Sequence, residues 1–191
     1  MGKTLKSNQS QGELINLNCF KNGKDEATGV SKILENEISK KGNFEVIKQI
    51  SNINNLSSIK NKYDKSNINY KFIEFTNDSH ELYNGIDLAI TRGGASTLSE
   101  LSFLKIPFIS IPLPSARDNH QFYNSEFYYK KNCCWLIKQE EFEFKKFSKM
   151  IIEIFNDYKN YNEKLKNLEE ITKKNTWNNI NNKIIEIIDE N

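Results

Sequence analysis

The stretch TRGGASTLSE combines residue types that can bind a phosphate group. Gly93 and Gly94 permit a backbone geometry and a close approach that a β-carbon would block. A helix that begins after them presents unpaired N–H groups and the positive end of its dipole, which favour an anion. Ser96 and Thr97 add hydroxyl donors, and the Glu100 carboxylate one turn further can accept two hydrogen bonds from a ribose diol. The stretch therefore indicates a site for a diphosphate-linked ligand.

The same ten residues also fit a purely structural role. Thr97 and Glu100 have the spacing of a capping box, in which the glutamate only ties back to the start of the helix. Two glycines after a strand often do no more than make a turn. The spacing is not the G-x-G-x-x-G of a dinucleotide site, and the residue after Gly94 is Ala95 rather than a Walker lysine. A hydride-transfer enzyme and an NTPase are therefore disfavoured.

A second polar segment, PLPSARDNHQ, follows the next apolar run of the chain. Asp118, Asn119, His120 and Gln121 supply closely spaced hydrogen-bonding groups that suit the hydroxyls of a sugar. Taken singly, three of them have a simpler interpretation: His120 is a surface or helix-start histidine, and Asp118 and Asn119 are helix caps. Two polar segments at the ends of neighbouring strands favour a binding site at one edge of a sheet.

Strands and helices alternate along the chain, with short connections. Short apolar or alternating runs predict strands, and apolar residues at helical spacing predict the elements between them. This order predicts a doubly wound α/β domain with a parallel sheet. In this interpretation the mixed polar stretch 16–29 is a loop or insertion. The predicted strands are 43–50, 70–75, 86–91, 106–113 and 133–137. The predicted helices are 30–41, 56–63, 78–84, one that follows the glycine pair, 121–131, 143–157, 159–173 and 176–189.

The composition is that of an ordinary protein of 191 residues, enough for one domain or one half of a two-lobed enzyme. The net charge is +2 and the lysines are scattered among acidic residues, so we expect no nucleic-acid partner. The sequence shows neither an apolar signal segment nor a membrane span. Three cysteines and two separated histidines predict reduced thiols, no metal site and no cofactor, in a cytoplasmic protein.

The segment from Asp87 to Asn124 resembles the donor-binding core of the family 28 glycosyltransferases. The family pattern is a strand ending in R-x-G-A-x-T-x-x-E, a strand ending in P-x-P, then D-N-H-Q and an asparagine. The likeness is greatest to the members that transfer GlcNAc from UDP-GlcNAc to the undecaprenyl-linked muramoyl-pentapeptide in peptidoglycan synthesis. The resemblance implies the Rossmann-like C-terminal lobe of a GT-B glycosyltransferase.

The resemblance also implies roles for individual residues. The diphosphate of UDP would lie at the glycine turn, the ribose diol at Glu100, and the uracil at the backbone of Thr76. Gln121, with His120 or Asn119 beside it, would hold the GlcNAc hydroxyls. In the family a G-G-S-Q-G loop contributes a further contact, which NQSQGE replaces here, with Ser10 as the matching residue. The residues implied at the diphosphate are Gly94, Ala95, Ser96 and Thr97.

These residues would make one donor-binding domain, with an atypical segment over 1–29 and C-terminal helices over 143–191. The acceptor lobe and the general base of such an enzyme fall outside the sequence, so we expect the lipid-linked acceptor to be bound by another lobe or a partner chain. The family also implies peripheral association with the cytoplasmic face of the inner membrane. Two alternatives stay open: the soluble catalytic subunit of a two-chain lipid-linked GlcNAc transferase, and a non-catalytic nucleotide-sugar binding module.

Overall fold

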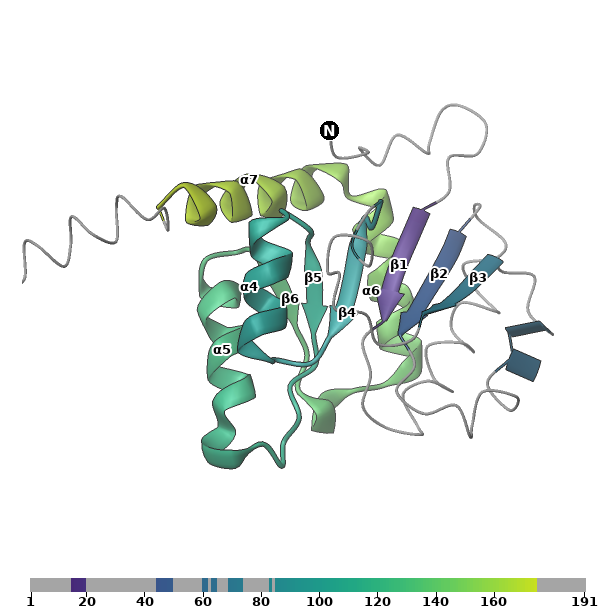
Figure 1. Cartoon of the computed structure of the whole chain (residues 1–191), viewed down its shortest axis with the longest axis horizontal. Coiled ribbons are helices and arrows are strands. Elements are labelled where there is room, and N and C mark those ends of the chain that lie inside the picture. Colours follow the sequence, from purple (N-terminus) through teal and green to yellow (C-terminus); the bar gives the residue numbers. More distant parts are fainter. Residues whose placement is uncertain are drawn as a thin grey trace, which may run out of the picture.

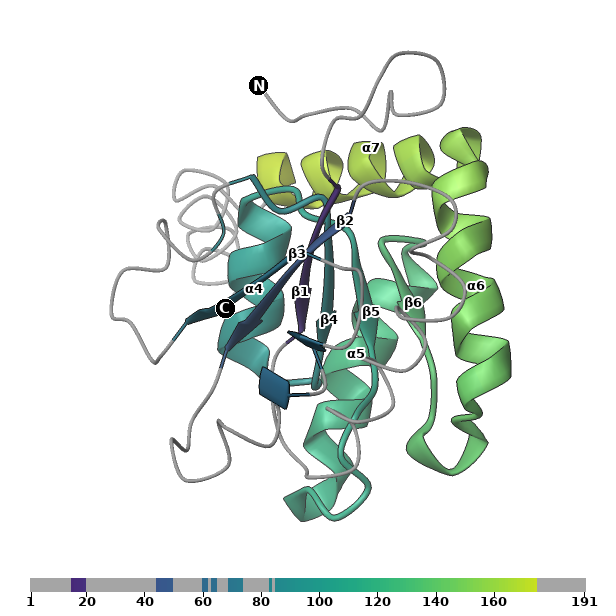
Figure 2. The ribbon, with the colours of Figure 1, turned by 90° about the vertical axis from the view of Figure 1, so that its right-hand side faces the viewer.

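The chain folds around one parallel sheet with helices on both faces (Figures 1 and 2). The computed structural model describes residues 15–19, 44–49, 60–61, 63–64, 69–73, 83 and 85–174. The strands lie in the order β3-β2-β1-β4-β5-β6, and every neighbouring pair is parallel. The doubly wound α/β architecture predicted from the sequence is confirmed. The strands are β1 (Ile15–Cys19), β2 (Phe44–Gln49), β3 (Asn69–Ile73), β4 (Leu88–Thr91), β5 (Phe108–Ser110) and β6 (Cys134–Leu136). The helices are α4 (Ala95–Phe103), α5 (His120–Lys130), α6 (Phe144–Asn156) and α7 (Tyr158–Lys174), with short 3-10 turns η3 (Arg117–Asn119) and η4 (Gln139–Glu141).

The strand β1 corrects one prediction from the sequence. Residues 16–29 were interpreted as a loop or insertion, whereas Ile15–Cys19 form a strand between β2 and β4. The run INLNC alternates apolar and polar residues, which is the pattern of a strand, but it has only five residues and contains two asparagines. Pairing with a strand on each side outweighs this weak local preference.

The centre of the sheet consists of residues that are buried on both faces. Every residue of β4 and of β5 is buried, and Ala89 pairs with Phe108 in register. Continuous apolar runs of this kind are typical of parallel strands that helices cover on both sides. These two strands therefore give rigid support to the segments that follow them.

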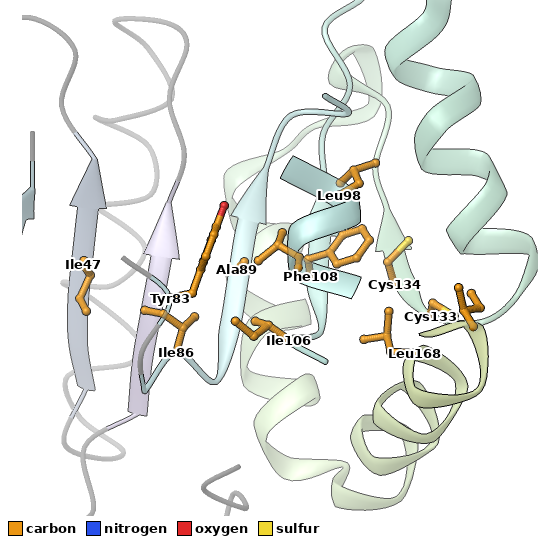
Figure 3. Close-up of a cluster of buried hydrophobic side chains, with 12 residues drawn as sticks. Ile47, Tyr83, Ile86, Ala89, Leu98, Ile106, Phe108, Cys133, Cys134 and Leu168 are labelled. Carbon is orange, nitrogen blue, oxygen red and sulfur yellow. The ribbon is translucent and has the colours of Figure 1, made fainter. Parts of the chain in front are cut away.

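Two hydrophobic clusters fill the layers between the sheet and its helices. One cluster joins Val46, Leu88 and Ile109 to α6, and the other joins Ala89 and Phe108 to α4. Figure 3 shows side chains of the second cluster. The helix α7 contributes Tyr161 to the first cluster and Leu168 to the second, and it crosses the amino ends of the strands (Figure 1).

The carboxyl ends of the strands lie at the edge of the sheet opposite α7 (Figure 1). The segments that leave β4, β5 and β6 at this edge contain the two polar motifs, and we call this edge the carboxyl rim. Among the helices of the described residues, none has the length and apolar character needed to cross a bilayer. Helix 30–41, helix 176–189, Ser10 and Thr76 lie outside the described residues.

Candidate functional site

The two glycines after β4 have different structural roles. A β-carbon on Gly93 would lie 2.0 Å from the backbone oxygen of Gln121 and 2.5 Å from Ser125 Oγ, so the turn packs directly on α5. Among the described residues, a β-carbon on Gly94 would meet only Thr97 Oγ1, at 3.9 Å. Gly94 has φ −69° and ψ 127°, a conformation open to any residue. Gly93 is therefore required by packing, whereas the part of the chain that the structure describes leaves open space beside Gly94.

The first turn of α4 faces this space with its N–H groups uncapped. Gly94 is the N-cap residue, and the first turn contains no acidic residue; within the described part of the chain, no side chain makes a capping hydrogen bond to this helix start. The first intrahelical bond of the turn is from Leu98 N to the Gly94 oxygen, at 3.0 Å. The backbone N–H groups of the residues between them have no intrahelical acceptor. Ala95 and Ser96 are exposed, and Thr97 is half-buried.

The capping-box alternative is wrong. Thr97 is the third residue of α4 rather than its N-cap, and Glu100 lies in the second turn. Glu100 Oε2 instead accepts a hydrogen bond of 3.0 Å from the hydroxyl of Tyr83. The half-buried Glu100 carboxylate is thus held on the same side of α4 as Tyr83, near the start of the helix.

The second polar segment turns through two left-handed residues. Asp118 and Asn119 have φ 52° and 53°, a conformation that asparagine and aspartate tolerate better than other side chains. Asn119 occupies the N-cap position of α5, but its side chain makes no capping hydrogen bond, and both residues are exposed. The interpretation of Asp118 and Asn119 as side-chain caps is therefore wrong, and their polar groups face solvent.

His120 and Gln121 begin α5 at the carboxyl rim. His120 Nδ1 lies 2.7 Å from the Arg117 backbone oxygen, so Nδ1 donates to that oxygen and Nε2 takes no part in this contact. Gln121 Oε1 accepts a hydrogen bond of 3.0 Å from Leu113 N. This bond fixes the side-chain amide against the backbone of residues 112–114. Both side chains thus have one end fixed by the backbone and a second polar end available.

Hydrogen bonds bring the two polar segments together. Asn124 Nδ2 donates to the Gly93 oxygen at 3.0 Å, and Ser125 Oγ donates to the Gln121 oxygen at 2.7 Å. Ser125 Oγ also lies 2.7 Å from Ser110 Oγ at the end of β5. The start of α5 is therefore held against the glycine turn, and the predicted residues Gly94 to Thr97, Glu100 and Asn119 to Gln121 share one rim.

Hydrogen bonds of Arg92 join the segments of the chain that form this rim. Its Nη1 donates to the Ile111 oxygen at 2.9 Å and to Gln139 Oε1 at 2.7 Å, so one buried guanidinium joins the segments after β4, β5 and β6. Arg92, Asn124, Ser125 and Tyr83 were not predicted as members of the site. The arginine and the asparagine belong to the sequence pattern quoted above, whereas no sequence signal identifies Ser125 or Tyr83.

Within the described residues, no group of three or more His, Cys, Asp or Glu side chains could hold a metal ion. The charged groups that the site offers to a ligand are therefore the helix start, Glu100 and the exposed side chains of η3 and α5. Ser10 and Thr76, the other two predicted contacts, lie outside the described residues. In the sequence, Ser10 comes before β1, which begins at Ile15, and not after the carboxyl end of that strand.

Comparison with known families gives one match to most of the chain. The model of the glycosyltransferase family 28 C-terminal domain matches residues 25–181. A protein of Pelagibacter ubique is 41% identical over 155 residues, which are 81% of this chain and 43% of that protein. A protein of Rickettsia bellii is 41% identical over 110 residues, 58% of this chain and 31% of that protein. Both carry the name UDP-N-acetylglucosamine–N-acetylmuramyl-(pentapeptide) pyrophosphoryl-undecaprenol N-acetylglucosamine transferase.

Solved structures share the fold at low sequence identity. MurG of Acinetobacter baumannii superposes with a TM-score of 0.67 at 19% identity, over 84% of this chain and 46% of that one. The glycosyltransferase VinC, solved with dTDP, gives a TM-score of 0.59 at 9% identity, over 86% and 38%. The chain thus spans less than half the length of the relatives and structures that it matches.

Proposed function

We propose a donor-binding function for this chain, from the premise that it belongs to the family of glycosyltransferase family 28 C-terminal domains. The ligand is UDP-GlcNAc, which the names of both relatives specify as the sugar donor. The reaction is the transfer of GlcNAc to the lipid-linked muramoyl-pentapeptide. These residues form the half of the transferase that holds the donor.

The uncapped first turn of α4 beside Gly94 is the observation that carries this proposal. Glycosyl transfer from UDP-GlcNAc leaves UDP, and negative charge grows on the β-phosphate as the bond to the anomeric carbon breaks. Backbone N–H groups aimed at that position stabilise the charge without needing to reorganise. The space beside Gly94 gives a diphosphate direct access to the N–H groups of Ala95, Ser96 and Thr97.

The remaining contacts divide between the nucleoside and the sugar. Glu100 accepts hydrogen bonds from the ribose diol, while the Gln121 amide, together with Asn119 or His120, holds the GlcNAc hydroxyls. Thr76 meets the uracil through its backbone. Holding the sugar at several hydroxyls orients its anomeric carbon for attack, which is a positioning task.

Acceptor binding belongs to the other lobe of the two-lobed architecture or to a partner chain. The relatives extend well beyond the matched region, and their printed names specify a pyrophosphoryl-undecaprenol acceptor. A lipid-linked acceptor places the reaction at a membrane surface, so the protein acts at the cytoplasmic face of the inner membrane by peripheral association. The general base that activates the acceptor hydroxyl is then contributed from outside the rim described here.

Calorimetric titration with UDP, UDP-GlcNAc and UDP-glucose tests the proposal directly. We expect binding of UDP, stronger or equal binding of UDP-GlcNAc, and weaker binding of UDP-glucose, since the rim holds amide and imidazole groups for the N-acetyl sugar. Each titration is run with and without Mg²⁺, which determines whether the helix start alone carries the diphosphate. Failure to bind any of the three ligands would contradict the donor function.

Glu100→Ala tests the contact to the ribose. Loss of hydrogen bonds to a charged acceptor weakens UDP binding by about 1.5–3 kcal/mol. Glu153→Ala is the matched control, because Glu153 is an exposed glutamate of α6 paired with Lys149 and is remote from the rim. Equal affinities of Glu100→Ala and the unmodified chain for UDP would remove Glu100 from the ligand site.

A further inference from the structure

The hydroxyl of Tyr83 is the partner of the proposed ribose-binding carboxylate. Tyr83 lies before β4 and is 5% exposed, within the hydrophobic cluster that also contains Ala89 and Leu98. Figure 3 shows its ring beside β4 with the hydroxyl oxygen toward the arrowheads of the strands. The ring is thus packed in the core while its one polar atom reaches Glu100 near the start of α4.

We propose that Tyr83 is a positioning residue that holds the Glu100 carboxylate in the orientation that accepts the ribose diol. This inference rests on the proposed donor function. The Tyr83 hydroxyl donates to Oε2 at 3.0 Å, which fixes the plane of the carboxylate. A carboxylate has about four acceptor positions, so one bond from Tyr83 leaves positions on both oxygens for two ligand hydroxyls.

The direction of this hydrogen bond is secure at neutral pH. Burial first, and then the hydrogen bond to Glu100, raise the pKa of Tyr83 well above its ordinary value of 10.0. The phenol therefore stays protonated and donates to Glu100 Oε2. Because the ring is buried in a hydrophobic cluster, the hydroxyl has little freedom to leave Glu100.

Orientation before binding lowers the entropy cost of ordering a long side chain on the ligand. Without Tyr83 OH, Glu100 would be free to sample other rotamers, and the diol would have to select one of them. A purely structural role, in which the bond only attaches α4 to the segment before β4, makes a different prediction. It would change stability without changing how the site distinguishes ligands that do and do not carry the ribose hydroxyls.

The test compares Tyr83→Phe with the unmodified chain for two ligands, UDP and 2′-deoxyuridine 5′-diphosphate. We expect Tyr83→Phe to weaken UDP binding by about two- to tenfold, the ordering cost of one side chain. Binding of the deoxy ligand, which lacks one of the two hydroxyls, should weaken by a smaller factor. The ratio of the affinity for UDP to the affinity for the deoxy ligand is therefore expected to be smaller in Tyr83→Phe than in the unmodified chain.

Tyr161→Phe is the matched control for loss of a buried tyrosine hydroxyl. Tyr161 is 2% exposed and its hydroxyl donates to the Asp87 backbone oxygen at 2.7 Å, on α7 and away from the carboxyl rim. This variant also loses one hydrogen bond, so its free energy of unfolding falls, but both ligand affinities should match those of the unmodified chain. Circular dichroism shows that each variant is folded before titration.

The outcomes separate this inference from the donor function. If Glu100→Ala abolishes the preference for UDP and Tyr83→Phe leaves it unchanged, the donor site stands and the role of Tyr83 is wrong. Equal weakening of both ligands by Tyr83→Phe also overturns it, since that is the result of a structural role. If the unmodified chain binds UDP without preferring it to the deoxy ligand, Glu100 does not read the diol and the inference falls while diphosphate binding stands.

Discussion

The two adjacent glycines after β4 have different roles: Gly93 allows close packing, and Gly94 leaves space for the proposed ligand. Gly93 allows α5 to approach until the Gln121 backbone oxygen occupies the place of a β-carbon. Gly94 has ordinary backbone angles and open space beside it, so the fold alone does not require a glycine there. In the proposed donor site, the diphosphate lies in the space that the described residues leave open beside Gly94.

Alanine substitutions at the two positions should therefore give opposite results. Gly93→Ala forces backbone against backbone and should lower the free energy of unfolding by about 3 kcal/mol or more. Gly94→Ala should leave that free energy unchanged or raise it by up to about 1 kcal/mol, because alanine restricts the unfolded chain. Its methyl group should nevertheless weaken UDP binding. Urea denaturation and calorimetry measure the two effects separately.

The pair of variants also contains its own counter-test. Normal UDP affinity in a stable Gly94→Ala variant would show that the diphosphate does not enter the space beside Gly94. Undiminished stability of Gly93→Ala would show that α5 can move away from the turn at no cost.

At the scale of elements, the central strands were predictable and β1 was not. The apolar runs that contain β4 and β5 predict buried strands, since few other arrangements bury so many consecutive residues. The run INLNC carries no such signal, and its place between β2 and β4 depends on partners distant in the sequence. The residue types of the two polar motifs can be read from the sequence. The hydrogen bond between Tyr83 and Glu100 cannot, because it depends on how the two residues pack and not on their spacing in the sequence.

Proline substitutions test the central position of β1. Asn18 pairs with Ile47 of β2 and with Ala89 of β4, so Asn18→Pro removes a backbone donor from a strand that has neighbours on both sides. We expect a loss of more than about 3 kcal/mol in the free energy of unfolding. Asn69→Pro is the control, because Asn69 is the first residue of the edge strand β3, where proline is tolerated. If urea denaturation gave the same free energy of unfolding for Asn18→Pro and Asn69→Pro, β1 would not lie between β2 and β4.

At the scale of the whole molecule, the amino and carboxyl edges of the sheet serve different purposes. The helix α7 closes the amino edge and brings Lys164, which is 4% exposed, to 2.8 Å from Asn132 Oδ1 and over the ring of Trp135. Cys133 and Cys134 are buried in the cluster that α7 covers. The edge opposite the carboxyl rim is therefore covered by α7 and contains two buried thiols, those of Cys133 and Cys134.

This packing predicts that the protein loses stability in alkaline solution. Burial raises the pKa of the Cys133 thiol from 9.0 to about 11 and that of Cys134 to about 12. Above pH 9 the thiols ionise in the unfolded chain and stay protonated in the folded one, so the unfolded state binds fewer protons and the free energy of unfolding falls. Burial lowers the pKa of Lys164 below its ordinary value of 10.5. Between the lowered pKa and pH 10.5 the unfolded chain holds this proton more tightly than the folded one, so Lys164 makes the free energy of unfolding rise with pH.

Cys134→Ala isolates one of these contributions. A group that is ionised in the unfolded state and neutral in the folded state changes the free energy of unfolding by about 1.4 kcal/mol per pH unit. Urea denaturation with a reductant between pH 8 and 11 should therefore show a slope above pH 9 that is shallower in Cys134→Ala by about this amount. Leu168→Ala, a truncation in the same cluster without a titratable group, should lower stability at every pH and keep the original slope. If Cys134→Ala also keeps that slope, the thiol ionises in the folded protein as readily as in the unfolded chain, and helix α7 does not seal the amino edge of the sheet from water.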